Sequence, residues 1–142
     1  MTPAPGDGFV VQAIGRVEST LTDRTAAPKQ GHEGAPDAWL VFVPHVRDAL
    51  RDLRVGDGIV VLTWFDRSDR NALQVHPRGD LSVPEQGVFS TRSPDRPNPI
   101  GIHPVRIVEI DDLRLLVGPL EAIDGTPVVD VKPQLDVETG IL

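Results

Sequence analysis

Cysteine and tyrosine are both absent from this chain of 142 residues. Without cysteine, disulfide bonds, thiolate ligands for metals and a cysteine nucleophile are excluded. Aromatic residues make up 4% of the chain, which leaves few rings on which the bases of a single-stranded nucleic acid could stack. No histidine spacing is typical of metal ligands, so we expect no metal site, and surface or capping roles for His32, His45, His76 and His103.

Positive charge is also scarce. With 14 basic and 21 acidic residues the net charge is −7, so a nucleic acid would have to bind at a local patch and not through an overall positive field. No apolar run approaches the length that spans a membrane. Residues 1–8 lack the basic start and the apolar core of a signal peptide. We therefore expect a cytoplasmic protein without a membrane partner.

The length and the spacing of apolar runs indicate one strand-rich domain. We expect a single domain over residues 1–142, with a flexible tail at 1–8 and no C-terminal accessory domain. Short apolar runs alternate with turn signals, which is typical of an antiparallel barrel or sandwich and not of a βαβ array. Strands are expected at 9–17, 39–43, 59–65, 105–110 and 113–117, with a weak one at 73–75.

Local patterns predict one helix and one hairpin turn within this mainly all-β chain. Apolar residues between Val46 and Leu53 fall at i, i+3, i+4 and i+7, which predicts one short amphipathic helix after Pro44. Asp111-Asp112 separates the runs 105–110 and 113–117 and suggests a hairpin turn between them. The remaining polar stretches are expected to form long loops.

The most distinctive segment is Gly87–Gly101, which reads GVFSTRSPDRPNPIG. Each of its prolines fixes its own φ and restricts the residue before it, so Ser93, Arg96 and Asn98 have few backbone states to lose when a ligand binds. Such preorganisation favours a binding site. The alternative is a proline-rich connection between strands, with solvated arginines or with Arg96 stacked on Phe89 or Trp64.

A second segment, Asp124–Pro133, reads DGTPVVDVKP. It combines a turn signal, an apolar strand, and an Asp and a Lys placed two residues apart on one face of that strand. Asp124 could simply start the turn before Gly125. Asp130 and Lys132 could form an exposed ion pair worth under ~1 kcal/mol.

Together the two segments resemble the signature blocks of the TrmO-like (TsaA-like) methyltransferases, in the same order and at compatible spacing. The resemblance spans about Ala13 to Leu135 and is strongest in the second half. It implies an antiparallel β-barrel, S-adenosyl-L-methionine as the cofactor, and a homodimer with cofactor sites near the subunit interface. It also implies methylation of threonylcarbamoyladenosine beside the tRNA anticodon. The glycine-rich turn of a Rossmann-type methyltransferase is not found, so the cofactor must be held differently.

The resemblance assigns the cofactor-binding residues by position. They are Pro28, Lys29, Gln30, Asp66, Arg67, Arg92, Ile102, Ala122, Ile123, Asp124 and Gly125. The guanidinium of Arg92 would meet the methionine carboxylate with bidentate geometry. Ile102 would form an apolar wall against the adenine. Residues 122–125 would offer backbone groups to the adenine edge and a carboxylate to the ribose hydroxyls.

The chain departs from the family pattern at three places. Lys29 replaces an arginine, Asp66-Arg67 stand where the family usually has a histidine, and Gln134 replaces a tyrosine. Lysine keeps the charge of arginine but loses its planar fork.

A sulfonium methyl donor is already activated, so catalysis is expected to rest chiefly on proximity and orientation. The amide-like or urea-like nitrogen of the acceptor is a poor nucleophile and needs its proton removed or its lone pair localised. Asp124 and Asp130 are the carboxylates available in the signature, and Asn98 could orient an acceptor carbonyl. Arg96 and Lys132 are candidates for substrate binding. No Ser-His-Asp arrangement is recognisable by spacing, and none is excluded.

Two alternatives to a tRNA methyltransferase remain open. The short chain, the acidic charge and the missing tyrosine favour a methyltransferase of the same fold that acts on a small molecule. A non-catalytic S-adenosyl-L-methionine-binding module is the other alternative. For tRNA, the phosphate contacts would come from a local group of cations, namely Lys29, Arg67, Arg70, Arg78 and Arg96.

Overall fold

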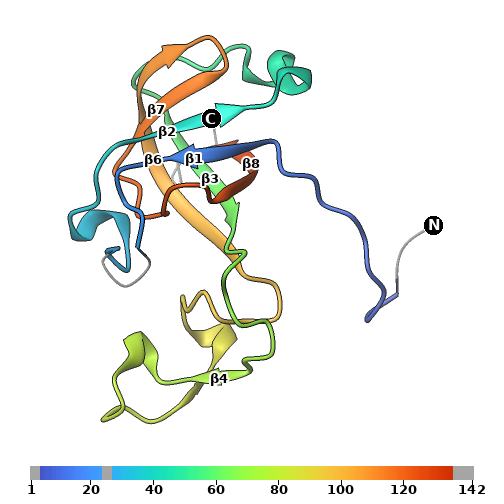
Figure 1. Ribbon diagram of the computed structural model, residues 1–142, viewed down its shortest axis with the longest axis vertical. Coiled ribbons are helices and arrows are strands. Elements are labelled where there is room, and N and C mark those ends of the chain that lie inside the picture. Colours follow the sequence, from blue (N-terminus) through green and yellow to red (C-terminus); the bar gives the residue numbers. More distant parts are fainter. Residues whose placement is uncertain (1–3, 24–26, 136–142) are drawn as a thin grey trace.

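The computed structural model describes residues 4–23 and 27–135. Six antiparallel strands close into a barrel in the order β1-β2-β7-β6-β3-β8, with β8 pairing back to β1 (Figure 1). The predicted antiparallel barrel is thereby confirmed. The strands are β1 (Gly15–Glu18), β2 (Ala38–Phe42), β3 (Gly58–Trp64), β6 (Ile100–Asp111), β7 (Arg114–Gly118) and β8 (Pro127–Pro133).

The core fills the inside of the barrel because alternate residues of each strand point inward. Strand β3, which matches the expected strand at 59–65, lies between β6 and β8. Ile59, Val61 and Thr63 are its buried residues, and the residues between them are only partly buried. The apolar core consists of Val17, Ala38, Leu40, Phe42, Ile59, Val61, Val105, Ile107, Leu115, Val117, Leu120, Ala122 and Val128.

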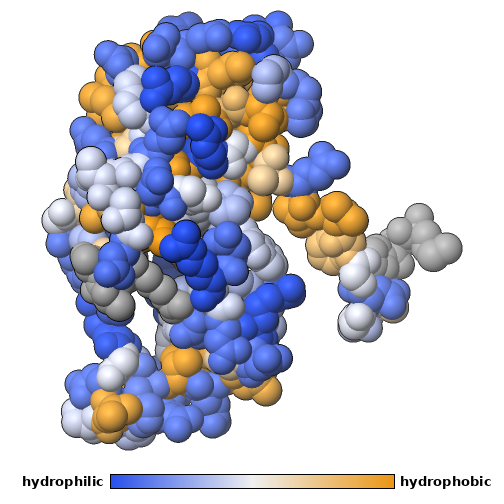
Figure 2. Space-filling view, viewed as in Figure 1, coloured by the Kyte–Doolittle hydropathy of each residue, from blue (hydrophilic) through white to orange (hydrophobic). Residues whose placement is uncertain are grey.

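The expected strand at 9–17 is wrong in its first half. Strand β1 begins only at Gly15, and Phe9, Val10 and Val11 are 76%, 88% and 58% exposed. Figure 2 shows their apolar atoms on the segment that leaves the barrel toward the N-terminus. An apolar run has strand propensity, but it forms a strand only where a neighbouring strand can pair with it.

The predicted helix is present, but it is a 3₁₀ helix. Helix η2 (Pro44–Leu50) starts with proline at its first turn and ends with i to i−3 hydrogen bonds, including Arg51 N to Asp48 O. Val46, Leu50 and Leu53 pack against the core as the apolar spacing indicated. Tighter winding suits a short helix that is fixed by tertiary contacts. The other 3₁₀ helices of the described ranges are η1 (Gly31–Glu33), η3 (Pro77–Gly79) and η4 (Val88–Ser90).

The hairpin of β6 and β7 turns one residue later than expected. Asp111 pairs with Arg114, so the turn residues are Asp112 and Leu113. Asp112 has a φ of 53°, a left-handed conformation that Asp tolerates better than most residues. Strand β6 also begins earlier than expected, at Ile100. It accommodates Pro104 because pairing with β7 starts only at Arg106.

Residues 66–99 leave the barrel between β3 and β6, and we call them the arm (Figure 1). The arm contains a two-stranded sheet of β4 (Gln74–Val75) and β5 (Gln86–Gly87), together with η3 and η4. The weak strand expected at 73–75 is therefore present as β4. No helix within 4–23 or 27–135 is long and apolar enough to cross a membrane.

Candidate functional site

Arg96 organises the loop that the sequence singles out. Its Nε donates to Ser93 O at 2.8 Å, and its Nη2 donates to Thr91 O at 2.6 Å and to Val88 O. The side chain is partly buried, so η4 and the residues after it wrap around the guanidinium. A charged donor shared among three carbonyls fixes the backbone more firmly than neutral hydrogen bonds would. A role of Arg96 in substrate binding stays a prediction.

Arg70 fixes the second half of the same loop. Its Nε donates to Pro97 O at 2.8 Å and its Nη2 donates to Asn98 Oδ1 at 3.0 Å. The same guanidinium lies 5.1 Å from the ring centroid of Trp64, so the stacking on Trp64 that was considered as an alternative for Arg96 is made by Arg70 instead. Asn98 has its oxygen engaged, which leaves its amide nitrogen as the group that it could offer to an acceptor carbonyl.

Arg92 lies between Thr91 and Ser93, whose carbonyls accept hydrogen bonds from Arg96. Its side chain is exposed, and its guanidinium forms no hydrogen bond or ion pair with the part of the chain that the structure describes. A rigid backbone therefore carries a cation without a partner among the described residues. This is the arrangement that a carboxylate ligand requires.

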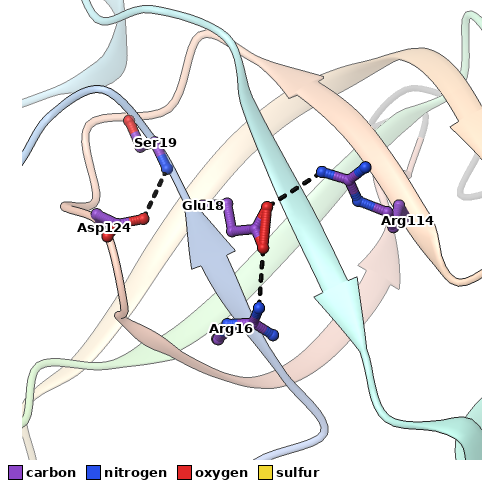
Figure 3. Close-up of polar contacts among 5 residues, drawn as sticks. All are labelled: Arg16, Glu18, Ser19, Arg114 and Asp124. Carbon is purple, nitrogen blue, oxygen red and sulfur yellow. Dashed lines mark hydrogen bonds and ion pairs between the residues drawn. The ribbon is translucent and has the colours of Figure 1, made fainter.

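Asp124 starts a turn, as its position before glycine suggested. Gly125 has a φ of +85° and donates from its backbone nitrogen to Val17 O at 2.7 Å. Asp124 Oδ1 accepts a hydrogen bond of 3.0 Å from the backbone nitrogen of Ser19 (Figure 3). One carboxylate oxygen thus holds the chain that leaves β1, and the second oxygen could bind a ligand hydroxyl.

An open groove of about 640 Å³ extends from this turn over β1, β2 and β7. Glu18 is one of its lining residues and lies 2.8 Å from Arg16 Nη2 and 3.1 Å from Arg114 Nη2 (Figure 3). Arg114 also lies 4.5 Å from the ring centroid of Trp39. The lining residues are Arg16, Glu18, Ser19, Thr20, Asp37, Ala38, Trp39, Leu116, Asp124 and Gly125. Of the predicted site residues, the groove contains Asp124 and Gly125.

The register of the barrel places Ile102 and Asp130 in one row. Leu62 of β3 pairs with Ile102 on one side and with Asp130 on the other. Ile102 is 43% exposed, so this row lies on the outer face of the barrel. Lys132 Nζ lies 2.9 Å from Asp130 Oδ2, and both side chains are substantially exposed. The ion pair considered from the sequence is therefore present.

The remaining predicted residues lie at three other places. Residues 28–30 lead into η1, with Lys29 exposed and its neighbours partly buried. Asp66 and Arg67 are exposed where β3 passes into the arm. Ala122 is buried at 2% exposure, so only its backbone could meet a ligand.

His103 belongs to a buried polar group that the sequence analysis missed. It is 1% exposed, which makes the expected surface or capping role wrong. Its Nδ1 lies 2.5 Å from Glu121 Oε1 and its Nε2 lies 2.7 Å from Thr63 Oγ1. The edge of the Phe65 ring approaches it at 5.8 Å between centroids. We call Thr63, Phe65, His103 and Glu121 the His103 cluster.

The hydrogen bonds of the His103 cluster follow from the chemistry of its members. A carboxylate only accepts, so Nδ1 of His103 carries the hydrogen and donates to Glu121. Nε2 and the hydroxyl of Thr63 share the second hydrogen bond of the ring. The signal for this residue was its place in β6, because inward positions alternate from Gly101 through His103 to Val105. This alternation could be recognised only once the strand was known to start at Ile100.

Two glycines fit closely around this cluster. A Cβ on Gly101 would lie against Thr63 Oγ1, 2.6 Å from Phe65 Cζ and 2.7 Å from His103 Nε2. A Cβ on Gly31 would lie 2.9 Å from Pro119 O and 3.1 Å from Glu121 Oε2. Both positions are therefore restricted to glycine by close approach, and Gly101 of the signature block is explained by what lies beneath it.

Thr63, His103 and Glu121 have the order of contacts found in a hydrolytic triad, but their burial argues against that chemistry. Thr63 is 0% exposed, so its hydroxyl cannot reach a substrate. Across 4–23 and 27–135, no group of three or more His, Asp or Glu side chains could hold a metal ion. The His103 cluster instead forms a rigid support beneath the neighbouring segments.

Comparison with known proteins supplies an independent line of evidence. A family model described as the tRNA-methyltransferase O N-terminal domain matches residues 16–137. An S-adenosyl-L-methionine-binding protein of Archaeoglobus fulgidus is 38% identical over 131 residues, which cover 90% of this chain and 93% of the relative. A probable S-adenosyl-L-methionine-binding protein of the same organism is 42% identical over 123 residues, covering 87% of this chain and 33% of the relative.

A solved structure shares the fold. The crystal structure of TrmO from Pseudomonas aeruginosa matches with a TM-score of 0.73 at 29% sequence identity, covering 91% of this chain and 55% of that one. The chain thus spans nearly all of one relative, a third of another and about half of the solved structure.

Proposed function

The chain belongs to the family of the tRNA-methyltransferase O N-terminal domain, and from this premise we propose that it is an S-adenosyl-L-methionine-dependent methyltransferase that methylates threonylcarbamoyladenosine beside the tRNA anticodon. The observation that carries the proposal is the exposed guanidinium of Arg92, which has no partner among the described residues and lies on a loop fixed by Arg96 and Arg70. Relatives named as S-adenosyl-L-methionine-binding proteins support the choice of cofactor.

In this proposal the cofactor is recognised at both of its ends. Arg92 binds the methionine carboxylate by charge-assisted hydrogen bonds. The turn at 122–125 binds the adenosine, with backbone groups on the adenine edge and the second oxygen of Asp124 on a ribose hydroxyl. Ile102, at 43% exposure, has apolar surface left to cover the ring. Residues 28–30 and 66–67 complete the set.

The reaction moves a methyl group from the sulfonium to a nitrogen of the acceptor. The carbon–sulfur bond breaks as the carbon–nitrogen bond forms, sulfur keeps the electron pair, and the acceptor nitrogen loses its proton. Asp130 is the carboxylate that could take that proton. When it does so, the proton replaces Lys132 as the partner of the carboxylate. Asn98 orients the acceptor carbonyl through its amide nitrogen.

The cofactor and the acceptor would meet in a homodimer. Ile100 and Ile102 are exposed by 50% and 43% on the outer face of β6, and Asp130 lies in the same row as Ile102. An apolar strip beside an ion pair suits a self-complementary surface. This dimer would place the candidate acid–base residue and the adenine wall near the twofold axis. A cytoplasmic location goes with this proposal.

A small-molecule acceptor is the second candidate. It is favoured by the internal hydrogen bonds and ion pairs of three arginines. The guanidinium groups of Arg70 and Arg96 donate hydrogen bonds to loop carbonyls and to Asn98, and Arg78 forms an ion pair with Glu33. Three of the five cations considered for phosphate binding are thus engaged within the chain. Phosphate contacts with RNA would then have to come from fewer cations than the sequence analysis considered.

Two measurements test the proposal. Thermal unfolding with S-adenosylmethionine, S-adenosylhomocysteine, NAD and ATP should show stabilisation by the two sulfur compounds alone, about 2.7 kcal/mol at 100 times the dissociation constant. Transfer of labelled methyl to tRNA carrying threonylcarbamoyladenosine should follow, with substrate binding that weakens steeply as salt rises. Absence of any cofactor shift would refute the methyltransferase. Cofactor binding with salt-independent methylation of a small acceptor would favour the second candidate.

A further inference from the structure

We propose that His103 and Glu121 are positioning residues, which hold the separate cofactor-binding segments in one arrangement through contacts beneath the binding surface. This inference rests on the proposed function for the identity of the ligand. The contacts themselves are independent of it. Neither side chain would touch the cofactor, because His103 is 1% and Glu121 12% exposed.

The two residues contact or adjoin four segments that are far apart in the sequence. His103 follows Ile102 directly, and its ring meets the edge of Phe65, the residue before Asp66-Arg67. Glu121 directly precedes Ala122, the start of the turn at 122–125. Its Oε2 also lies so close to Gly31, the residue after Gln30, that a Cβ there would be 3.1 Å away. Each segment is thus fixed one residue away from its proposed ligand contacts.

The polar character of the pair is what makes this more than core packing. A histidine and a glutamate inside a barrel lose hydration, and an apolar pair of similar volume would stabilise the fold as well or better. Hydrogen bonds add direction, because Nδ1 and Nε2 of one ring tie Glu121 and Thr63 to fixed places. No buried side-chain nitrogen or oxygen in the described residues lacks a hydrogen-bond partner, so the network is complete. A satisfied network fixes geometry, and binding sites require that geometry.

Three variants separate positioning from stability. Glu121→Leu removes the acceptor for Nδ1, whereas Glu121→Gln keeps an oxygen that can accept the same hydrogen bond. Ile107→Val removes one methylene from the core at a buried position of β6 outside the His103 cluster, and it serves as the control for lost stability. All three are compared well below their melting temperatures.

The first readout needs no cofactor. Amide hydrogen exchange is measured by NMR at Glu33, Phe65, Asp124 and Gly125, whose backbone nitrogens donate hydrogen bonds in three of the four segments. We expect Glu121→Leu to exchange at least tenfold faster at these amides, Glu121→Gln to approach the original rates, and Ile107→Val to leave them unchanged relative to the rest of the barrel. Equal exchange in Glu121→Leu and the original protein, or the same pattern in Ile107→Val, would overturn the proposal.

The second readout is the dissociation constant of S-adenosylhomocysteine by calorimetry. We expect at least a tenfold rise in Glu121→Leu, recovery in Glu121→Gln, and no change in Ile107→Val. An unchanged constant in Glu121→Leu would overturn positioning for this ligand. If the original protein binds no S-adenosylhomocysteine, the proposed function fails, and the exchange rates still decide whether the pair positions the three segments that these amides report on.

Discussion

Arg78 of η3 and Glu33 of η1 form an ion pair of 2.6 Å that joins the arm to the loop before β2. The two residues are 45 positions apart in the sequence. The hydrogen bond from Arg78 lowers the pKa of Glu33, and the same bond raises the pKa of Arg78. The pair is therefore a charged tether between two segments that the proposed site needs to hold together.

This tether predicts a pH dependence of the arm. The lowered pKa of Glu33 means that its contribution is present above the unfolded pKa of about 4.3 and is lost as the pH falls through the folded pKa. Exchange of arm amides should therefore increase below that range. Arg78→Gln should raise the pKa of Glu33 toward its ordinary value, as measured by carboxyl NMR. An unchanged Glu33 pKa in this variant would contradict the assignment of the cause.

Arg92→Ala should weaken cofactor binding by roughly 1.5–3 kcal/mol, the range for a hydrogen bond to a charged group, and leave the fold intact. Arg92→Lys should recover only part of the loss, because an ammonium lacks the planar fork. Calorimetric titration with S-adenosylhomocysteine measures both. Arg51→Ala, also exposed, is the matched control. Equal affinity in the folded Arg92→Ala and the original protein would remove Arg92 from the site.

Arg96→Ala should act on the loop before it acts on any ligand. Loss of the bonds to Ser93, Thr91 and Val88 leaves carbonyls without their charged donor, and we expect a stability loss of roughly 1.5–3 kcal/mol in urea unfolding. Cofactor affinity should fall as well, because Arg92 lies on the same loop. A variant with normal stability and a selective defect in acceptor binding would instead establish the substrate role expected from the sequence.

Gly101→Ala should destabilise the barrel by roughly 1–3 kcal/mol, since the new methyl group overlaps the Phe65 ring and the His103 imidazole. Gly87→Ala is the control within the same signature block, because a Cβ there meets nothing within 4 Å. Urea unfolding of the two variants gives the comparison. Similar stability of the two variants would mean that the His103 cluster rearranges at little cost to make room for the methyl group. That result would contradict the close fit seen in the structure.

Much of the barrel could be predicted because its strands carry strong local signals. The runs at 39–43 and 59–65 match β2 and β3 to within one residue at each end. Phe9–Val11 carries an equal signal and forms no strand, because pairing depends on neighbours that a local pattern does not contain. The turn at Asp112-Leu113 moved by one residue for a related reason, since the register is set across the whole β6–β7 ladder.

The sequence could predict those parts of the candidate site that depend on residues close together in one segment. It could not predict the parts that depend on contacts between distant segments. The turn at Asp124-Gly125 and the pairing of Asp130 with Lys132 follow from spacing along one segment. The His103 cluster combines residues from β3, β6 and the chain after β7, and no spacing joins them. Arg96 and Arg70 were considered for phosphate contacts, and only the folded loop shows that they bind its own carbonyls.

The barrel is sealed unevenly. Two residue pairs join β1 to β8, whereas seven join β3 to β6. The β1–β8 ladder is therefore much shorter than the β3–β6 ladder, and the turn at 122–125 lies directly beside it. A ligand bound at that turn would also hold strands β1 and β8 together. Occupancy of the site and the rigidity of the closed barrel would therefore rise and fall together.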